Sequence, residues 1–340
     1  MNTNKKSILI VGGAGYIGVE LAKDLIKNGF NIHCFDNLIY RQKIPKIDKK
    51  NFKFIKGDLC NKKDYKSLFK TSYEAIVMLA GLVGDPVTKK YSNISKKIND
   101  IGILNLIKEF QKVKNFKKFI FISTCSNYGL VKKKIKIKEN YKLAPLSLYA
   151  KSKVKIEKFL MKKKNNFKPT ILRFATAFGY SERMRYDLTI NQFVLEMLFK
   201  KNIEVYDYDT WRPYCHIKDF SRLIIKVINS KHNLTDYKVF NAGSDKNNFN
   251  KRKIAEKIRK YLGGKIKLTK TSFDKRNYIV DFSKVENTLG FKAKYSVDFG
   301  IKEIIINIKK NKKKFNQLKK LGNFVLYYGK KKNWFIPTKN

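Results

Sequence analysis

The chain has 340 residues, of which 43% are hydrophobic and 14% are aromatic. This composition excludes a disordered or low-complexity protein, although 30% of the residues are charged. Basic residues outnumber acidic ones by 76 to 27, but only nine of them are arginines and the lysines are spread along the whole chain. We interpret the charge as a diffuse lysine background and expect no specific nucleic-acid partner; a selected anionic partner is the alternative.

The cysteines and the apolar runs indicate the compartment. The four cysteines, Cys34, Cys60, Cys125 and Cys215, show no C-x-x-C spacing and no neighbouring histidine cluster. Neither a metal site nor a disulfide framework is therefore expected. The N-terminus is polar, and no apolar run approaches the roughly 18 residues of a membrane helix. We expect a cytoplasmic protein with no membrane span.

Apolar runs alternate with helix-like segments through the first half of the chain. Runs typical of buried strands lie at residues 7–11, 31–35, 52–55, 75–79, 119–122 and 170–174. Helical periodicity lies between them at residues 15–27, 62–69, 95–113 and 147–161. This alternation predicts an α/β protein with a doubly wound parallel sheet of the Rossmann type.

After residue 173 the pattern loosens. Helices are expected at residues 188–200, 217–229, 251–261 and 297–309, and strands at residues 203–206 and 237–241. We expect a dinucleotide-binding domain at residues 1–173, completed by about 214–243. A smaller, interleaved substrate-binding lobe would comprise residues 174–213 and 244–308. The basic extension at residues 309–340 carries aromatic residues that suggest contact with a membrane surface or a partner, or packing on its own fold or on a dimer mate.

The turn after the first predicted strand carries a glycine motif, G-x-x-G-x-x-G, at Gly12, Gly15 and Gly18. Such glycines allow the backbone to approach a pyrophosphate at the N-terminus of the following helix. Asp36 ends the second strand, where a carboxylate accepts hydrogen bonds from an adenosine ribose and repels a 2′-phosphate. The pattern predicts NAD rather than NADP. Glycines that serve only a tight turn are the alternative.

A second motif, Y-x-x-x-K, places Tyr149 and Lys153 one helical turn apart. A nearby ammonium group stabilises a phenolate and lowers the tyrosine pKa, as proton transfer from a sugar hydroxyl requires. The bare pattern is common in a lysine-rich chain. Here, however, the hydroxyl-rich stretch at residues 123–129 follows the fifth strand, where a hydroxyl group can complete a proton relay.

With these motifs in register, the chain resembles the extended short-chain dehydrogenase/reductase family over about residues 7–308, and specifically its NAD-dependent nucleotide-sugar epimerases and dehydratases. The resemblance implies that Thr124, Tyr149 and Lys153 are catalytic, with Tyr149 as the general base, and that Asp58 lies by the adenine. The NAD contacts that it implies are Gly12, Gly15, Tyr16, Ile17, Gly18, Asp36, Asn37, Asp58, Leu59, Leu79, Ala80, Gly81, Tyr149 and Lys153.

The second half of the chain resembles the family as well. The stretch W-R-P-Y-C-H-I-K-D at residues 211–219 is similar to the segment whose arginine contacts the nucleotide diphosphate, which implies this role for Arg212. Arg276 is similar to a second diphosphate arginine, and forked guanidinium groups suit a pyrophosphate. A surface ion pair is the alternative for either arginine. We interpret His216 as a packing or capping residue rather than a catalytic one.

Departures from the family pattern bear on the reaction. Cys125 and Ser126 stand where dehydratases and decarboxylating members carry acids, so water elimination would lack its acid. Thr176 replaces an asparagine that many members place near the substrate phosphate. Arg183 and Arg185 belong to an R-M-R-x-D-L block that resembles a less characterised branch. Thr176, Arg183 and Arg185 therefore join Arg212 and Arg276 as expected substrate contacts.

The expected activity is that of an NAD-dependent epimerase that oxidises and re-reduces carbon 4 of a nucleotide-diphosphate sugar. A 4-dehydrogenase or ketoreductase without epimerisation needs the same three catalytic residues and is the alternative enzyme. An alternative of another class is a non-catalytic NAD-binding scaffold with an anionic partner. The resemblance also implies a homodimer.

Overall fold

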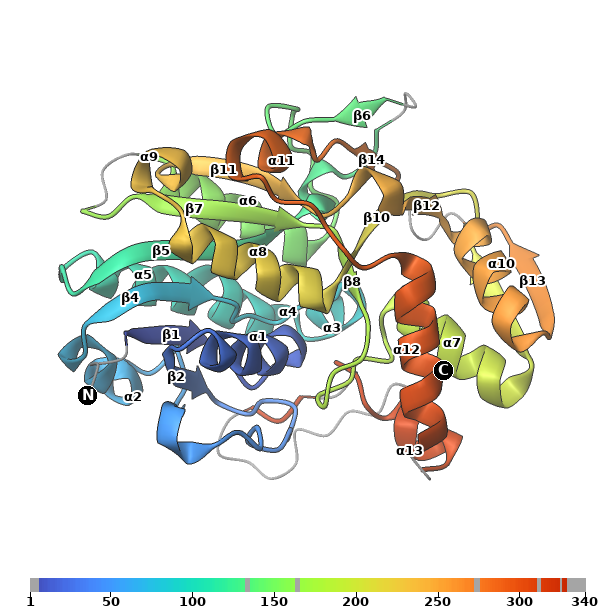
Figure 1. Ribbon diagram of the computed structural model, residues 1–340, viewed down its shortest axis with the longest axis horizontal. Coiled ribbons are helices and arrows are strands. Elements are labelled where there is room, and N and C mark those ends of the chain that lie inside the picture. Colours follow the sequence, from blue (N-terminus) through green and yellow to red (C-terminus); the bar gives the residue numbers. More distant parts are fainter. Residues whose placement is uncertain are drawn as a thin grey trace.

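A seven-stranded parallel sheet forms the centre of the computed structural model, which describes residues 6–131, 135–162, 166–271, 276–310, 313–324 and 326–328 (Figure 1). The strand order is β11-β7-β5-β4-β1-β2-β3, and every neighbouring pair is parallel. The strands are β1 (Ser7–Val11), β2 (Asn31–Asp36), β3 (Phe52–Lys56), β4 (Tyr73–Met78), β5 (Phe116–Thr124), β7 (Pro169–Phe174) and β11 (Lys238–Ala242). The predicted doubly wound Rossmann-type sheet is confirmed.

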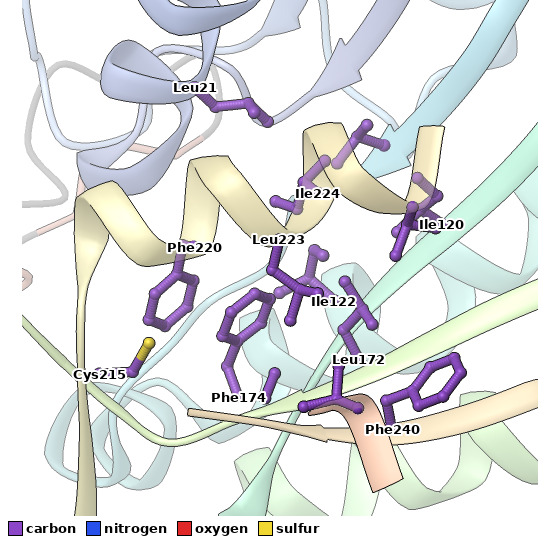
Figure 2. Close-up of a cluster of buried hydrophobic side chains, with 14 of the residues drawn as sticks. Leu21, Ile120, Ile122, Leu172, Phe174, Cys215, Phe220, Leu223, Ile224 and Phe240 are labelled. Carbon is purple, nitrogen blue, oxygen red and sulfur yellow. The ribbon is translucent and has the colours of Figure 1, made fainter. Parts of the chain in front are cut away.

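Helices cover both faces of this sheet. The helices α1 (Tyr16–Lys27), α8 (Ile217–Asn229) and α11 (Ser283–Leu289) pack on one face through an apolar cluster that is shown in part in Figure 2. In that cluster the rings of Phe174 and Phe220 stack almost in parallel. The opposite face is covered by α2 (Lys62–Tyr65), α3 (Asp85–Lys90), α5 (Ile103–Phe110) and α6 (Leu148–Leu160). Burial on both faces explains why the central strands are continuous apolar runs.

One predicted helix is interrupted. The segment expected to be helical at residues 95–113 consists of α4 (Ser92–Ser95), a π-helical stretch (Lys96–Gly102) and α5. In the π-helical stretch the buried side chain of Asn99 accepts a hydrogen bond from Leu82 N and donates one to Leu82 O, at 2.8 and 2.9 Å. These contacts tie the stretch to the loop after β4. The wider turn therefore coincides with a position where a helical side chain holds a neighbouring loop.

The later part of the chain builds smaller sheets and a third apolar core. β8 (Thr176–Phe178), β10 (Trp211–His216) and β12 (Asn248–Asn250) form one sheet. β9 (Asn202–Tyr206) pairs with β13 (Lys265–Thr269), and β6 (Lys136–Ile137) pairs with β14 (Ile279–Val280). The third core lies mainly among α7 (Thr189–Lys200), α10 (Lys251–Leu262) and α12 (Val297–Lys310). Of these strands only β9 was predicted, at residues 203–206. Most of the others have five residues or fewer, which is why periodicity missed them.

Two shorter helices, α9 (His232–Thr235) and α13 (Phe315–Lys319), complete the described elements. His216 caps α8, because its Nδ1 accepts a hydrogen bond from Lys218 N. This agrees with the interpretation of His216 as a capping residue. Within the described residues, no helix is both long and apolar enough to cross a bilayer.

After α13 the chain returns to the loop that follows β2. Tyr186 N donates a hydrogen bond to Leu321 O, and Tyr327 N donates one to Ile39 O in the loop after β2, at 2.8 and 2.7 Å. The aromatic residues at 324, 327 and 328 therefore pack on their own fold, which was one of the expected alternatives. Residues 334 and 335 lie outside the described residues.

Candidate active site

A cavity of about 480 Å³ lies at the carboxyl ends of the parallel strands. Its wall includes the last residues of four strands, Val11, Asp36, Thr124 and Phe174. This is the edge at which open α/β sheets bind ligands. Apart from Asp58, all the site residues expected from the sequence line it: Gly12, Gly15, Tyr16, Ile17, Gly18, Asp36, Asn37, Leu59, Leu79, Ala80, Gly81, Thr124, Tyr149, Lys153, Thr176, Arg183, Arg185, Arg212 and Arg276.

The glycine turn forms one end of the cavity. Gly12 has φ +86°, and a Cβ atom there would lie 2.7 Å from the backbone of Ala80, so a side chain is excluded by both conformation and space. A Cβ atom on Gly18 would lie 2.5 Å from Gly13 O, so α1 packs directly against the turn. The N-terminus of α1 thus begins at the cavity wall, where its N–H groups favour an anionic ligand.

Asp36 is fixed beside this turn. Its Oδ2 accepts a hydrogen bond from Ala14 N at 3.0 Å, and its Oδ1 accepts one from Leu38 N at 2.8 Å. Burial raises the pKa of Asp36, whereas these backbone hydrogen bonds lower it. The carboxylate therefore has a set orientation at the end of β2, which is the placement expected for a group that meets a ribose.

Thr124, Tyr149 and Lys153 meet in the middle of the cavity. Thr124 ends β5, and α6 brings the other two residues to it from its first turns, after its N-cap Ser147. The Tyr149 phenol is hydrogen-bonded to the Thr124 side chain. Lys153 Nζ donates to Ile122 O at 2.7 Å and lies 5.9 Å from the centroid of the Tyr149 ring. The arrangement is that of a proton relay with an anchored ammonium group.

Burial dominates the protonation of this group. It raises the pKa of the Tyr149 phenol, whereas the charge of Arg185 and the hydrogen bond to Thr124 lower it. Burial also lowers the pKa of Lys153 to about 8, against the opposing charge of Glu157. The sequence predicted a lowered pKa for Tyr149, and this prediction is wrong for the structure described. The reason is that burial disfavours the charged forms of both the phenol and the ammonium group.

Two arginines reach the cavity from the second half of the chain. Arg276 Nη1 pairs with Asp85 Oδ2 of α3 at 2.6 Å, and both side chains are about one-quarter exposed. Arg212 donates to the backbone oxygens of Trp211 and Arg276. The ion pair that was the alternative for Arg276 is thus present, but it lies in the cavity wall rather than on the outer surface.

Arg183 and Arg185 lie on the side of the cavity that holds Asp36. The guanidinium of Arg183 is 5.0 Å from the Tyr40 ring centroid, and Arg185 Nη2 pairs with Asp187 Oδ2 at 2.5 Å. Burial, together with the charge of Arg185, lowers the pKa of Arg183 to about 10. The charge of Arg183 acts on Asp36, whereas that of Arg185 acts on Tyr149. Their role as substrate contacts stays a prediction.

Comparisons with known proteins agree with this geometry. Residues 8–243 match the profile of the NAD dependent epimerase/dehydratase family. The chain belongs to this family. An uncharacterized protein of Methanocaldococcus jannaschii is 31% identical over 315 residues, which cover 87% of this chain and 94% of the relative.

Two further relatives of this epimerase/dehydratase family member carry assigned activities. The bifunctional UDP-glucose 4-epimerase and UDP-xylose 4-epimerase 1 of Pisum sativum is 27% identical over 339 residues, covering 88% of this chain and 94% of the relative. The crystal structure of UDP-glucose 4-epimerase from Thermotoga maritima with UDP-glucose has a TM-score of 0.80 at 24% identity. It covers 89% of this chain and 99% of the other. This structural likeness shows the fold.

The family member is an NAD-dependent enzyme, and its residues fit the dinucleotide. The glycine turn has no room for a Cβ atom at Gly12 or Gly18, and Asp36 is hydrogen-bonded to Ala14 of this turn, as expected for a carboxylate that meets a ribose. Three buried oxygens, those of the Tyr40 hydroxyl, the Asp85 Oδ1 and the Asn323 amide, have no hydrogen-bond partner among the described residues. All three residues line the cavity. Unpaired polar atoms in a cavity wall are typical of a site that binds a polar ligand.

Asp58 is placed differently from its neighbours. Gly57 and Leu59 line the cavity, but Asp58 does not. Its Oδ1 accepts a hydrogen bond from Cys60 N at 2.8 Å, and its carboxylate also contacts the phenol of Tyr328. A role for Asp58 beside the adenine therefore stays a prediction.

Sequence reasoning missed the polar support behind Thr124, Tyr149 and Lys153. Glu157, one turn after Lys153, accepts hydrogen bonds from Arg173 Nη2 at 2.7 Å, from Asn127 Nδ2 at 2.8 Å and from the Ser123 hydroxyl. These buried contacts join α6 to β5 and β7, the elements that carry Tyr149 and Thr124. Two features of the sequence could have indicated this support. Glu157 lies one helical turn after Lys153, and Arg173 is a charged residue within an apolar strand.

The positions after Thr124 differ from each other. Cys125 is buried, donates its thiol to Arg173 O at 3.1 Å and has its pKa raised by burial. It does not line the cavity, whereas Ser126 does. Neither residue supplies an acid beside Thr124.

Proposed function

We propose that this enzyme is a nucleotide-sugar 4-epimerase. The observation that carries the proposal is the meeting of Thr124, Tyr149 and Lys153 in one cavity, which Gly12, Asp36, Arg212 and Arg276 also line. In this proposal the glycine turn and Asp36 form the dinucleotide end of the cavity, and Arg212 and Arg276 form its sugar end. The absence of an acid at Cys125 and Ser126 favours epimerisation over water elimination. The relative from Pisum sativum named above as a 4-epimerase supports the same class of reaction.

Proton transfer falls to Tyr149 in this mechanism. Burial raises the pKa of the Tyr149 phenol, and the nearby positive charges of Lys153 and of bound NAD oppose this and favour the phenolate. The phenolate takes the proton of the sugar 4-hydroxyl, and Thr124 shares the hydrogen bond that orients that oxygen. Lys153, held by Ile122 O, stabilises the phenolate. NAD, when bound, supplies the hydride acceptor and the positive charge of the nicotinamide ring. Tyr149 returns the proton to the same oxygen after the 4-keto sugar has presented its other face.

Arg212 and Arg276 hold the nucleotide diphosphate while the sugar turns. Their forked guanidinium groups can each form two parallel hydrogen bonds with phosphate oxygens. Arg276 must first exchange its partner, because its Nη1 already pairs with Asp85. Thr176 lines the same part of the cavity and contacts the sugar or its phosphate in this proposal.

The site also supports proposals on compartment and assembly. All four cysteines are free, and three of them are buried, which suits a reducing cytoplasm. We infer a homodimer from the family resemblance alone. Sedimentation velocity of the purified enzyme tests this, and a monomer at all concentrations would contradict it.

Product analysis tests the proposed reaction. The purified enzyme is mixed with UDP-, GDP- and dTDP-sugars, and the products are identified by chromatography and proton NMR while absorbance follows NADH. We expect one sugar nucleotide to give its 4-epimer without net accumulation of NADH. Stoichiometric NADH with a keto-sugar product would instead identify a 4-dehydrogenase. Binding of NAD without conversion of any sugar would favour the non-catalytic scaffold.

A further inference from the structure

The end of the described chain forms part of the cavity wall. We call residues 321–324 and 326–328 the tail segment. Asn323 and Phe324 of this segment line the cavity together with the glycine turn and Asp36. Asn323 is only 5% exposed, and its side-chain oxygen is one of the buried oxygens without a partner among the described residues. Such an atom at a cavity wall favours a donor on a bound ligand, for example a ribose hydroxyl.

The first half of the tail segment is tied to two loops of the cavity. Asn323 N donates to Asp187 Oδ1 at 3.1 Å, in the segment that carries Arg183 and Arg185. Asn323 Nδ2 donates to Val83 O at 3.3 Å, in the loop after β4. Both Asp187 and Val83 line the cavity. The tail segment therefore joins a loop of the first half of the chain to a loop of the second half at the cavity wall.

The second half is tied to the loop after β2. Tyr327 N donates to Ile39 O at 2.7 Å, and the guanidinium of Arg41 lies 3.7 Å from the centroid of the Tyr327 ring. Leu326 is buried against the sheet-facing core, and the Tyr328 phenol contacts Asp58 and Cys60. Because Ile39 follows Asp36 closely, these contacts lie at the ribose end of the cavity rather than at the sugar end.

We propose that the tail segment belongs to the cofactor site and that Asn323 contacts NAD. In this proposal the segment is a strap, which must detach from the loop after β2 before NAD leaves. The strap closes the site with side chains far from the glycine motif in the sequence. NAD is then retained over many turnovers. Retention suits a reaction that must return its hydride to the sugar from which it came. The inference concerns the cofactor only and holds whichever sugar is the substrate.

Cofactor exchange tests the strap directly. Enzyme loaded with isotopically labelled NAD is chased with unlabelled NAD, and the label that remains bound is followed over time. The double variant Arg41→Ala/Tyr327→Ala removes the ring contact outside the cavity. We expect it to exchange NAD about tenfold faster than the unaltered enzyme, which corresponds to about 1.4 kcal/mol. Lys320→Ala, an exposed residue just before the tail segment, is the control and should leave the rate unchanged. An exchange rate within twofold of that of the unaltered enzyme would contradict the proposal that the tail segment is a strap.

Limited proteolysis provides a measurement that needs no variant. Trypsin cleavage after the exposed Lys319 and Lys320 is followed with and without added NAD. If the strap closes over NAD, the cofactor slows this cleavage. Equal cleavage rates with and without NAD would contradict the proposal, even if the double variant failed to fold.

Calorimetric titration of the Asn323→Ala variant with NAD tests whether Asn323 contacts the cofactor. We expect its Kd for NAD to rise roughly tenfold, and an unchanged Kd would remove Asn323 from the site.

Discussion

The two ends of the cavity are built on different principles. At the dinucleotide end, backbone geometry shapes the site, with Gly12 forced to be glycine and Asp36 held by two backbone N–H groups. At the sugar end, charged side chains from separate parts of the chain meet, and Arg276 is already paired with Asp85. The first end is fixed largely by the backbone, whereas in the second Arg276 must exchange its ion pair with Asp85 when it binds an anion.

This difference assigns separate tasks to the two ends. A preformed site loses little conformational entropy on binding and can retain its ligand tightly. A site whose cations already have partners gives up part of its binding free energy to the exchange, which favours release of product. One end thus suits a cofactor that stays, and the other suits a substrate that enters and leaves in every turnover. Thr124, Tyr149 and Lys153, the proposed catalytic residues, lie where the two meet.

The largest effect is expected where the ends meet, from Tyr149→Phe. The substitution removes the only group proposed to take the substrate proton but keeps the ring, so folding and NAD binding should persist. Turnover should fall by about 10²–10⁴-fold. Steady-state kinetics with the sugar nucleotide that the enzyme converts measure this. Tyr141→Phe, at an exposed tyrosine outside the cavity, is the matched control. Near-normal turnover of Tyr149→Phe would show that the proposed relay is wrong.

Gly12→Ala tests how strictly the dinucleotide end is preformed. The new Cβ atom would meet the Ala80 backbone at 2.7 Å, so the turn must shift. We expect NAD affinity to fall by about 100-fold, or about 2.7 kcal/mol, in calorimetric titrations. Gly29→Ala is the control, because Gly29 has a similar φ of +84° but no atom within 4 Å of its Cβ position. Both variants bear the cost of a left-handed conformation, so an equal loss of NAD affinity would contradict the steric argument.

Burial of Lys153 predicts a pH-dependent stability. Its pKa is about 8 in the folded protein and is higher in the unfolded chain, where no burial acts on it. Between these values the unfolded state binds more protons, so this residue's destabilising contribution is present below pH 8 and declines as the pH rises above it. We expect Lys153→Met to unfold at higher denaturant concentration than the unaltered protein near pH 7, and the gap to narrow toward pH 10. A gap that widens with pH would contradict the assignment.

The carboxylate of Asp36 should discriminate between the two dinucleotides by more than about tenfold in favour of NAD, or about 1.4 kcal/mol. The reason is repulsion of the 2′-phosphate of NADP by a buried carboxylate that its hydrogen bonds hold in place. Calorimetric titration with NAD and NADP measures the ratio, and Asp36→Asn should bring it toward unity. Equal affinities in the unaltered protein would remove Asp36 from the ribose site.

The same contrast explains what the sequence could predict. The parallel sheet, the glycine turn and the Tyr149–Lys153 spacing follow from periodicity and from contacts within one or two turns, which a sequence displays directly. The support of Glu157 by Arg173 and the contact of Tyr327 with Ile39 join segments that only the folded chain brings together. The direction of the Tyr149 pKa shift was also wrong, because residue spacing does not show how completely a phenol is enclosed.

The smallest expected effect concerns the ion pair of Arg276 with Asp85 at the sugar end. Asp85→Asn leaves Arg276 without its ionic partner, so an incoming diphosphate no longer has to displace a carboxylate. Because the pair is partly exposed, it contributes only about 0.2–1 kcal/mol. The affinity for the nucleoside diphosphate of the converted sugar should therefore rise by a factor of about 1.4–5.

Two further variants decide whether that gain comes from Arg276 itself. Arg276→Ala should weaken nucleoside diphosphate binding, and Asp85→Asn should have no effect in its presence if the carboxylate acts through Arg276. Glu286→Gln removes a negative charge from an exposed pair with Lys292 outside the cavity, and so controls for the general rise in positive charge. If Glu286→Gln strengthened binding as much as Asp85→Asn, the gain would come from the diffuse lysine background. The sugar end would then owe its anion affinity to net charge rather than to an exchangeable ion pair.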